Sequence, residues 1–315
     1  MNANILHPSH LRALIWVAPC IGAWSLIPLL AANTGGLSSH QYLFASSFVS
    51  AVTLTISATL AGRARTIWTY FNATDLPRLT TLALLGAFGY YALLYAAYAP
   101  CPEGTCPGKP LRIIIAQYTW PAFGVIWSAI LLRDRLTVRM LMSLALGILA
   151  VCVGASTGAA AGVGPAKLAP VVLAAVMFGL YSALMKKFDY EPFSSLAWTF
   201  SAASVMSWVA MMATFSPIQA PGWTALHSIL INGVLVNGLS YVCWQRALRA
   251  APITFVAPWI SLTPVFAAIF TAANASAGAL VLGIVLVLLS VLLATLPTRR
   301  AGEPGALRQQ SAAGV

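Results

Sequence analysis

Three rows of aromatic and amide side chains recur at helical spacing within apolar stretches of the chain. Residues three, four or seven apart share one face of a helix. The rows are Tyr91, Tyr95 and Tyr98; Phe178, Tyr181 and Met185; and Asn237, Tyr241 and Trp244. Rings combined with a few hydroxyl, amide and indole groups are suited to holding a small molecule by noncovalent contacts. Packed helix interfaces use the same residues, so a purely structural role stays open for each.

A polar side chain and a proline lie four residues apart in Gln117-Tyr-Thr-Trp-Pro121. Proline has no N–H, so Pro121 leaves the carbonyl of Gln117 without its helical partner. We therefore expect the carbonyl and the amide of Gln117 to lie together at a kink. Trp120 shares a face with Gln117, whereas Tyr118 can face the same cavity only if the helix is distorted. The alternative is that Pro121 only kinks a packed helix.

The chain lacks the groups that catalysis requires. No Asp, Glu, Lys, Arg or His lies deep inside an apolar stretch, and the four His are in the tails or near the ends of these stretches. Membrane hydrolases and transferases need acids, histidines or metal clusters near the interface, and no phosphate-binding loop is present. The sequence therefore predicts no enzymatic activity, no cofactor and no metal site.

Ten apolar stretches carry these side chains, each about 20 residues long, as a helix needs to cross a bilayer. The chain is 60% hydrophobic and 7% charged, whereas a soluble domain carries about 25% charged residues. We predict an all-α membrane protein, embedded in the lipid bilayer, with ten transmembrane helices. Their ranges are 13–32, 41–61, 79–99, 113–132, 140–156, 168–185, 194–214, 225–245, 253–272 and 277–296.

The basic residues alternate between the gaps that separate these helices. One set of gaps and the C-terminal tail hold all but three of the 17 Lys and Arg: Arg12, Arg63, Arg65, Arg78, Arg133, Arg135, Arg139, Lys186, Lys187, Arg246, Arg249, Arg299, Arg300 and Arg308. The other set holds Lys109, Arg112 and Lys167. Because positive charge is enriched on the cytoplasmic side, we expect both termini in the cytoplasm. Basic residues scattered over short gaps form no nucleic-acid-binding stripe, so no nucleic-acid partner is expected.

Two parts of the chain repeat one motif. A Tyr-rich stretch ending at Pro100 is followed by Pro121, and a similar stretch ending at Pro252 is followed by Pro264. The first interval is longer by the length of 101–109, which we interpret as an insertion.

This repetition predicts two five-helix repeats, 1–156 and 168–296, followed by a disordered cytoplasmic tail, 297–315. Because five is odd, the second repeat enters the membrane in the opposite orientation. Inverted repeats place a binding site near the midplane, between the two halves.

Cys101 and Cys106 lie in a Pro-rich segment of the insertion. The charge pattern places this segment outside the cytoplasm, where disulfides persist. The sequence allows either a disulfide or two free thiols in a rigid loop. The segment offers too few ligands for a metal site.

Several motifs together resemble a known family. They are Trp24-Ser25, the helices containing Pro121 and Pro264, and Gly147-Ile-Leu-Ala-Val-Cys-Val-Gly154. Over nearly its whole length the chain resembles the EamA-type drug/metabolite transporter superfamily. Gln117-Tyr-Thr-Trp-Pro121 is similar to the Asn-Tyr-Leu-Trp-Pro stretch of the bacterial aromatic amino acid exporter branch, and Phe178-Gly-Leu-Tyr181, Lys186 and Val242-Cys-Trp244 match that branch in spacing. Gln117 and Phe178 depart from it, because Asn and Trp are expected there.

The resemblance implies a multi-pass exporter of neutral and aromatic amino acids and related small metabolites in a bacterial inner membrane. We expect it to act as a monomer by alternating access. We also expect transport to be uncoupled or only weakly coupled, running down the substrate gradient, because no intramembrane carboxylate is available as a proton or cation carrier. The expected substrate-lining residues are Trp24, Tyr91, Tyr95, Gln117, Tyr118, Trp120, Phe178, Tyr181, Tyr241 and Trp244. The expected hinges are Pro19, Pro28, Pro121, Pro258 and Pro264. Tyr98 ends its stretch and is expected in the interfacial aromatic belt.

Two alternatives remain open from the sequence. The first is a transporter of other small metabolites or drugs, although anionic nucleotides call for Lys or Arg in the cavity and cations call for a carboxylate. The second is a membrane scaffold that transports nothing.

Overall fold

The computed structural model describes residues 8–99, 113–114, 116–134, 136–156, 165–215 and 218–271, together with a few positions between 282 and 293. All regular structure in these residues is helical. The α-helices are α1 (Pro8–Ser25), α2 (Ile27–Ala32), α3 (Ser39–Leu60), α4 (Ala64–Thr69), α5 (Asp75–Leu82), α6 (Tyr90–Tyr98), α8 (Trp120–Leu132), α9 (Val138–Ser156), α10 (Pro165–Phe188), α11 (Pro192–Ala213), α12 (Trp223–Ile231), α13 (Ser240–Ala250), α14 (Ile253–Ile260) and α15 (Thr263–Thr271). Two π-helices, η1 (Ala83–Gly89) and η2 (Asn232–Leu239), connect α5 to α6 and α12 to α13.

Six helical stretches of the described chain are long and apolar enough to cross a membrane. They are Pro8–Ala32, Ser39–Leu60, Asp75–Tyr98, Leu168–Phe188, Pro192–Ala213 and Trp223–Ala250. These stretches confirm the prediction of an all-helical membrane protein. The number of ten helices stays a prediction, since most of the span 277–296 lies outside the described residues. The tail 297–315 and the pair Cys101 and Cys106 also lie outside them.

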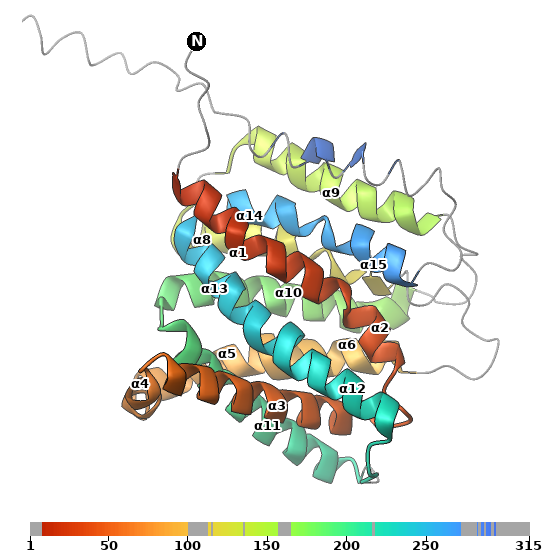
Figure 1. Ribbon diagram of the computed structural model, residues 1–315. Helices are drawn as coiled ribbons and strands as arrows, with labels where there is room; N and C mark the ends of the chain where they lie inside the picture. Colours follow the sequence, from red (N-terminus) through yellow and green to blue (C-terminus); the bar gives the residue numbers. More distant parts are fainter. Residues whose placement is uncertain are drawn as a thin grey trace, which may run out of the picture.

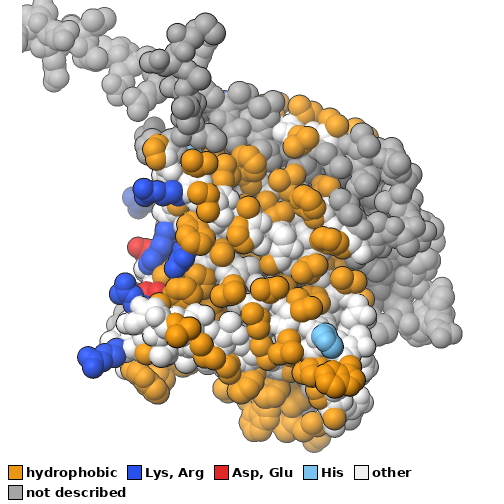
Figure 2. Space-filling view, in the orientation of Figure 1, with side chains coloured by type: hydrophobic (Ala, Val, Ile, Leu, Met, Phe, Trp, Pro, Cys, Tyr) orange, Lys and Arg blue, Asp and Glu red, His pale blue; other side chains and the backbone are white. Residues whose placement is uncertain are grey.

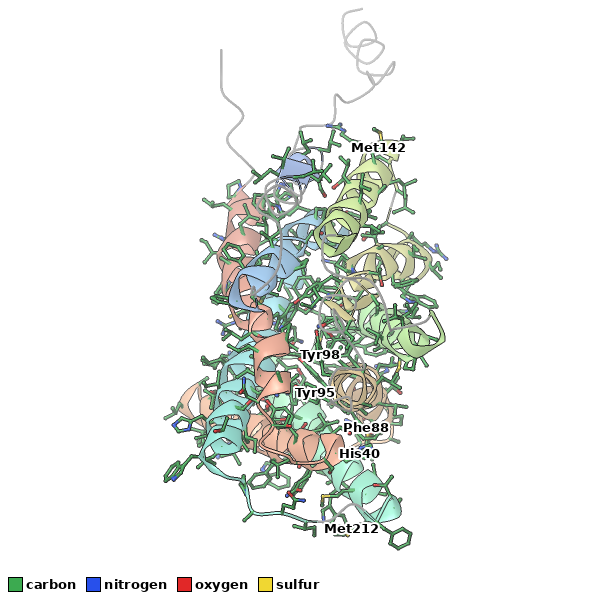
Figure 3. All side chains as sticks on the ribbon, turned by 90° about the vertical axis from the view of Figure 1, so that its right-hand side faces the viewer. His40, Phe88, Tyr95, Tyr98, Met142 and Met212 are labelled. Carbon is green, nitrogen blue, oxygen red and sulfur yellow. The ribbon has the colours of Figure 1, made fainter. Side chains whose placement is uncertain are left out.

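The helices pack side by side with their long axes roughly aligned, and α9 and α11 form opposite edges of the bundle (Figure 1). Viewed from the side, Tyr95 and Tyr98 lie in the interior, whereas Met142 and Met212 lie at the two edges (Figure 3). Lys and Arg side chains gather at one end of the helices, and hydrophobic side chains cover the middle (Figure 2). We call this end the basic end; Arg63 lies there just after α3, with Lys186 and Arg249 in the last turns of α10 and α13.

Three helices begin with proline as their second residue: Pro28 in α2, Pro121 in α8 and Pro264 in α15. A proline is tolerated there because the N–H groups of the first turn have no helical partner. The predicted kink at Pro121 is therefore a complete break, in which a turn at 118–119 precedes the new helix. Pro19 and Pro258 instead lie inside α1 and α14.

The two π-helices occupy similar places in their spans, each between two α-helices and just before a tyrosine-bearing segment. π-Helical turns are rare and frequently occur at functional sites. Both π-helices pack closely against other helices. A Cβ on Gly86 would lie 2.3 Å from the ring of Tyr181, and a Cβ on Gly233 would lie 2.6 Å from the Cβ of Val49. The sequence did not predict either π-helix.

Side-chain hydroxyls donate to backbone carbonyls near the helix breaks and near the π-helix η1. The Tyr118 hydroxyl donates to the carbonyl of Trp24 at 3.2 Å. Ser25 Oγ lies 3.1 Å from the carbonyl of Thr263 and 2.6 Å from that of Ile21. The Tyr241 hydroxyl donates to the carbonyl of Gly86 at 3.0 Å. Backbone groups that leave the regular pattern inside a bilayer need such partners, so these contacts join the irregular segments into one region.

Gly179 provides a test of how closely α10 and α8 pack. A Cβ at this position would lie 2.7 Å from the backbone nitrogen of Gly124 and 2.8 Å from the carbonyl carbon of Phe123. Because backbone atoms cannot move without shifting the helix, Gly179→Ala should lower stability by about 1–3 kcal/mol. Thermal unfolding in detergent measures the effect. Gly22→Ala in α1 is the control, because no atom lies within 4 Å of the added carbon. Equal melting temperatures for the two variants would contradict this packing.

Candidate binding site

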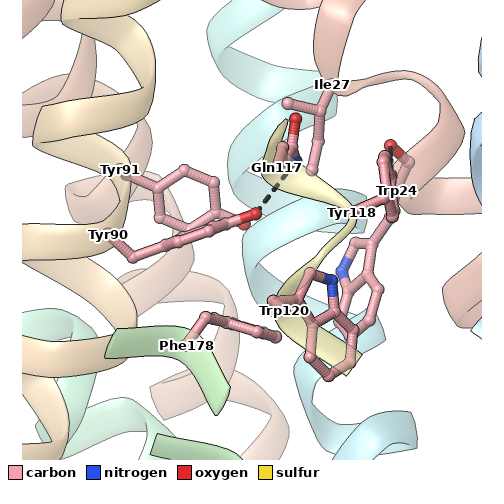
Figure 4. A pocket seen from close by; sticks show the side chains of 8 residues that line it. All are labelled: Trp24, Ile27, Tyr90, Tyr91, Gln117, Tyr118, Trp120 and Phe178. Atoms are coloured by element: carbon pink, nitrogen blue, oxygen red, sulfur yellow. Dashed lines mark hydrogen bonds between the residues drawn. The ribbon is translucent and has the colours of Figure 1, made fainter. Parts of the chain in front are cut away.

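A small cavity lies in the interior of the bundle. It is lined by Trp24, Ile27, Tyr90, Tyr91, Gln117, Tyr118, Trp120 and Phe178 (Figure 4). These residues come from α1, α2, α6, the segment before α8, α8 itself and α10. The cavity measures about 10 Å³, which is room for about one water molecule. The side chains therefore fill nearly all of the site in this state.

Phe178 is at the centre of the aromatic packing around the cavity. Its ring centroid lies 4.6 Å from that of Tyr90, 4.8 Å from Trp120, 5.4 Å from Tyr181 and 5.9 Å from Tyr241. The pairs with Trp120 and Tyr241 are edge-on. Aromatic pairs of this kind contribute about 0.5–1.5 kcal/mol each beyond area burial. Through them, Phe178 joins α10 to three other spans.

Two buried polar groups in this cluster have no hydrogen-bond partner among the described residues. They are the indole N–H of Trp24 and the hydroxyl of Tyr181. The neighbouring indole of Trp244 differs, because it donates to Ser182 Oγ at 3.2 Å. A buried donor without a partner costs about 1–3 kcal/mol. The Trp24 indole, which lines the cavity, is therefore free to bond an incoming molecule, whereas the Tyr181 hydroxyl lies behind the lining residues.

The amide of Gln117 bonds two tyrosines. Its Nε2 donates to the Tyr90 hydroxyl at 2.9 Å, and its Oε1 accepts from the Tyr98 hydroxyl at 3.3 Å. The turn at 118–119 directs both Gln117 and Tyr118 to the cavity, as we expected for a distorted helix. Pro121 was expected to leave the backbone carbonyl of Gln117 without its helical partner. The hydrogen bonds that this residue makes to Tyr90 and Tyr98 come from its side-chain amide.

All ten residues predicted to line the site are buried, and the structure brings most of them together. Trp24, Tyr91, Gln117, Tyr118, Trp120 and Phe178 line the cavity itself. Tyr181, Tyr241 and Trp244 pack behind them in the same aromatic cluster. Tyr95 lies further away, where its ring packs against those of Tyr91 and Tyr42.

The sequence reasoning missed three residues at the site: Ile27, Tyr90 and Tyr98. Tyr98 was expected in an interfacial belt, and this was wrong, because the side chain is only 8% exposed and bonds Gln117. Tyr90 lies off the face defined by Tyr91, Tyr95 and Tyr98 on a regular helix. It follows η1 directly, and no sequence signal had indicated this π-helix.

Hydrogen bonds close the bundle at the end opposite the basic end. The Tyr42 hydroxyl lies 3.0 Å from Ser228 Oγ, which donates to the carbonyl of Leu30 at 2.8 Å. Asn232 Nδ2 donates to the Tyr95 hydroxyl at 2.7 Å. We call these five residues the distal gate. Its side-chain contacts are between neutral groups, and they join α2, α3, α6, α12 and η2.

A second set of contacts closes the basic end, and we call Lys186, Asp189, Tyr190, Gln245 and Arg249 the basic gate. Arg249 Nε donates to Asp189 Oδ1 at 2.5 Å, and its Nη2 donates to the carbonyl of Tyr190 at 2.8 Å. Gln245 Nε2 donates to the same carbonyl at 2.7 Å. The Lys186 ammonium donates to the carbonyl of Leu248, in the last turn of α13, and to that of Ala251, just after it.

A tyrosine hydroxyl extends this network towards α4. The Tyr70 hydroxyl accepts from the backbone N–H of Glu191 at 3.2 Å. Burial raises the pKa of Tyr70 to about 12, and the nearby carboxylates add to this. Tyr70 is therefore neutral at physiological pH, so this contact should be insensitive to pH there.

Residues 168–296 match the EamA-like transporter family. This match indicates a membrane transporter of small molecules and supports the expected drug/metabolite transporter superfamily. A solved structure, described only as "Crystal structure of protein", is 19% identical to the chain. The two align over 90% of this chain and 98% of the other with a TM-score of 0.75, which shows a shared fold alone. No curated protein matches the chain in sequence.

The two indoles of the aromatic cluster allow a matched test. Trp24→Phe and Trp244→Phe each remove one buried indole, but only Trp244→Phe breaks a hydrogen bond, the one to Ser182. We expect Trp244→Phe to be less stable than Trp24→Phe by about 1 kcal/mol. Thermal unfolding of both variants in the same detergent measures this difference. A larger loss of stability in Trp24→Phe would show that the bonding of the two indoles is wrongly assigned.

Proposed function

We propose that the protein exports neutral and aromatic amino acids and related small metabolites by alternating access, without ion coupling. One observation carries the proposal. The closed cavity is lined by aromatic rings and the amide of Gln117, and none of its lining residues is charged. In a chain whose second half matches a transporter family, such a cavity suits a small molecule without net charge.

The chemistry of the site fits a zwitterion with an apolar side chain. Its carboxylate needs donors, and the Trp24 indole, which lines the cavity, offers one without losing an existing bond. Its ammonium needs acceptors, and the side-chain oxygen of Gln117, which accepts one bond from Tyr98, can accept a second. Aromatic rings pack against the substrate side chain. Phosphorylated substrates and organic cations suit the site less well, because no lining residue carries a compensating charge.

The proposed architecture is two inverted five-helix repeats, 1–156 and 168–296, with both termini and the basic end in the cytoplasm. The helix that restarts at Pro121 and the one that restarts at Pro264 lie at matching places in the two repeats. So do the π-helices η1 and η2. These parallels support the repeat, which is expected to hold the site between its halves. We further propose a monomer in a bacterial inner membrane.

The proposed transport cycle opens the two gates alternately. Both gates are closed in this structure, and a cavity of about 10 Å³ has no room for an amino acid. Entry from either side must therefore separate one gate and part the rings around Phe178. Pro19, Pro28, Pro121, Pro258 and Pro264 are the proposed hinges, since helices bend or break most easily at proline.

Resistance to toxic amino acid analogues tests the function. Cells that express the protein should survive higher concentrations of a halogenated phenylalanine than cells without it. Gln117→Ala and Trp120→Ala should each lower that resistance, by about ten-fold if 1.4 kcal/mol of substrate binding is lost. Trp223→Ala, which changes an exposed residue far from the cavity, should retain it.

The outcomes of this experiment separate the alternatives, provided that membrane levels of the variants are equal. Unchanged resistance in both cavity variants would overturn the proposed site. If the unmodified protein confers no resistance, flux of a labelled metabolite panel in proteoliposomes identifies a transporter of other substrates, and no flux at all identifies a scaffold.

Flux with and without a pH gradient tests the proposed lack of coupling. None of the residues lining the cavity is Asp, Glu or His, which are the usual intramembrane proton carriers. Proteoliposomes with a substrate gradient should therefore release labelled amino acid at the same rate whether or not a pH gradient is imposed. Strict dependence on the pH gradient would overturn uncoupled transport and leave the site assignment intact.

A further inference from the structure

A groove of about 400 Å³ lies between α3 and α11, apart from the candidate binding site. Phe48 and Ile56 of α3 and Val205 of α11 line it, and these three side chains are 55%, 54% and 61% exposed. The two helices lie together at the lower edge of the bundle, where hydrophobic side chains dominate the surface (Figures 1 and 2). The volume falls within the roughly 300–1,000 Å³ of ligand pockets. A ligand here meets the bilayer core and must be apolar.

The groove leads towards the basic end along both helices. Arg63 follows Ile56 of the groove by seven residues, just beyond the end of α3. On α11, Trp198 precedes Ser201 of the groove by three residues and so shares its face. Ser194 Oγ donates to the carbonyl of Arg63 at 3.1 Å. This bond fixes the segment after α3 against the start of α11.

Two positive charges are available at this end of the groove. Arg63 and Arg65 are exposed, and neither has an ion-pair partner among the described residues. The neighbouring carboxylates already have other partners. Glu191 accepts from the backbone N–H of Ser194 at 2.7 Å, and Asp75 accepts from the Tyr190 hydroxyl at 2.6 Å. The guanidinium groups can therefore bind an external anion.

An indole donor lies between the groove and these charges. Trp198 Nε1 is buried and has no hydrogen-bond partner among the described residues. Its ring stacks on Phe71 at 5.1 Å, and Phe71 stacks on Trp68 at 5.7 Å. Tryptophan in membrane proteins is enriched at the level of the lipid headgroups. These aromatic side chains therefore indicate the headgroup level beside the groove.

We propose that this groove binds one anionic phospholipid from the leaflet at the basic end. One acyl chain lies in the groove between α3 and α11. The phosphate lies at Arg63 and Arg65. A second copy of the chain fits less well, because it would bring two further arginines to the same place without a free carboxylate. An anionic lipid neutralises both charges.

Photo-crosslinking tests this proposal. The full-length protein is reconstituted with phosphatidylglycerol or phosphatidylcholine that carries a diazirine on one acyl chain, and labelled peptides are mapped by mass spectrometry. We expect phosphatidylglycerol to label 48–56 and 201–205 several-fold more than phosphatidylcholine does. Substitution of Arg63→Gln and Arg65→Gln should reduce that labelling by about five-fold per charge removed, the equivalent of roughly 1 kcal/mol at an anionic surface.

Matched variants separate a specific site from ordinary lipid contact. Thr55→Phe fills the groove from an exposed position and should abolish its labelling, whereas Ile130→Phe on the exposed face of α8 should not. Arg12→Gln removes a basic charge from α1 and should leave the labelling unchanged. Equal labelling by the two lipids, or no loss in the double arginine variant, overturns the proposal. Protein-to-protein crosslinks through the groove in place of lipid adducts would also overturn it and identify a second copy as the occupant.

Discussion

The bilayer core offers no hydrogen-bond partner to the backbone, and this constraint governs where the chain can leave helical geometry. The break between α1 and α2, the turn at 118–119 and the break between α14 and α15 are all covered by other helices. Side chains of one irregular segment satisfy carbonyls of another, as Tyr118 does for Trp24 and Ser25 does for Thr263. The irregular segments must therefore cluster, and the cavity lies where they meet.

The need to satisfy buried polar groups also determines which groups at the cavity hold it closed and which can bind a ligand. Most polar groups near the cavity hold the closed state together, such as the amide of Gln117 between Tyr90 and Tyr98. The N–H of Trp24 and the hydroxyl of Tyr181 add no hydrogen bond to the closed state, because neither has a partner among the described residues. A substrate at the proposed site that meets the Trp24 N–H adds a hydrogen bond without first breaking one. Recognition can therefore stabilise an open or loaded state relative to the empty closed one.

Much of the fold and part of the site could be read from the sequence. The length of the hydrophobic stretches predicted the spans. Prolines lie where helices begin again after a break, at Pro28, Pro121 and Pro264. The aromatic rows indicated Phe178, Tyr181 and Tyr241, which the structure packs in one cluster. The π-helices could not be foreseen, since neither contains proline and each depends on close packing by glycine, as at Gly86 and Gly233. The residues that η1 reorients, above all Tyr90, were missed for that reason.

The two gates differ in how strongly they resist opening. In the basic gate, the side chains of Arg249 and Asp189 are 37% and 66% exposed, and ion pairs this exposed contribute only about 0–1 kcal/mol. Water can replace their contacts before the helices separate. In the distal gate, Tyr42, Ser228, Asn232 and Tyr95 are all buried, so separating them leaves polar groups in an apolar interior until water or substrate arrives. The exposed pair of Arg249 and Asp189 is therefore the less costly contact to break, which fits the proposed loading of substrate from the cytoplasm.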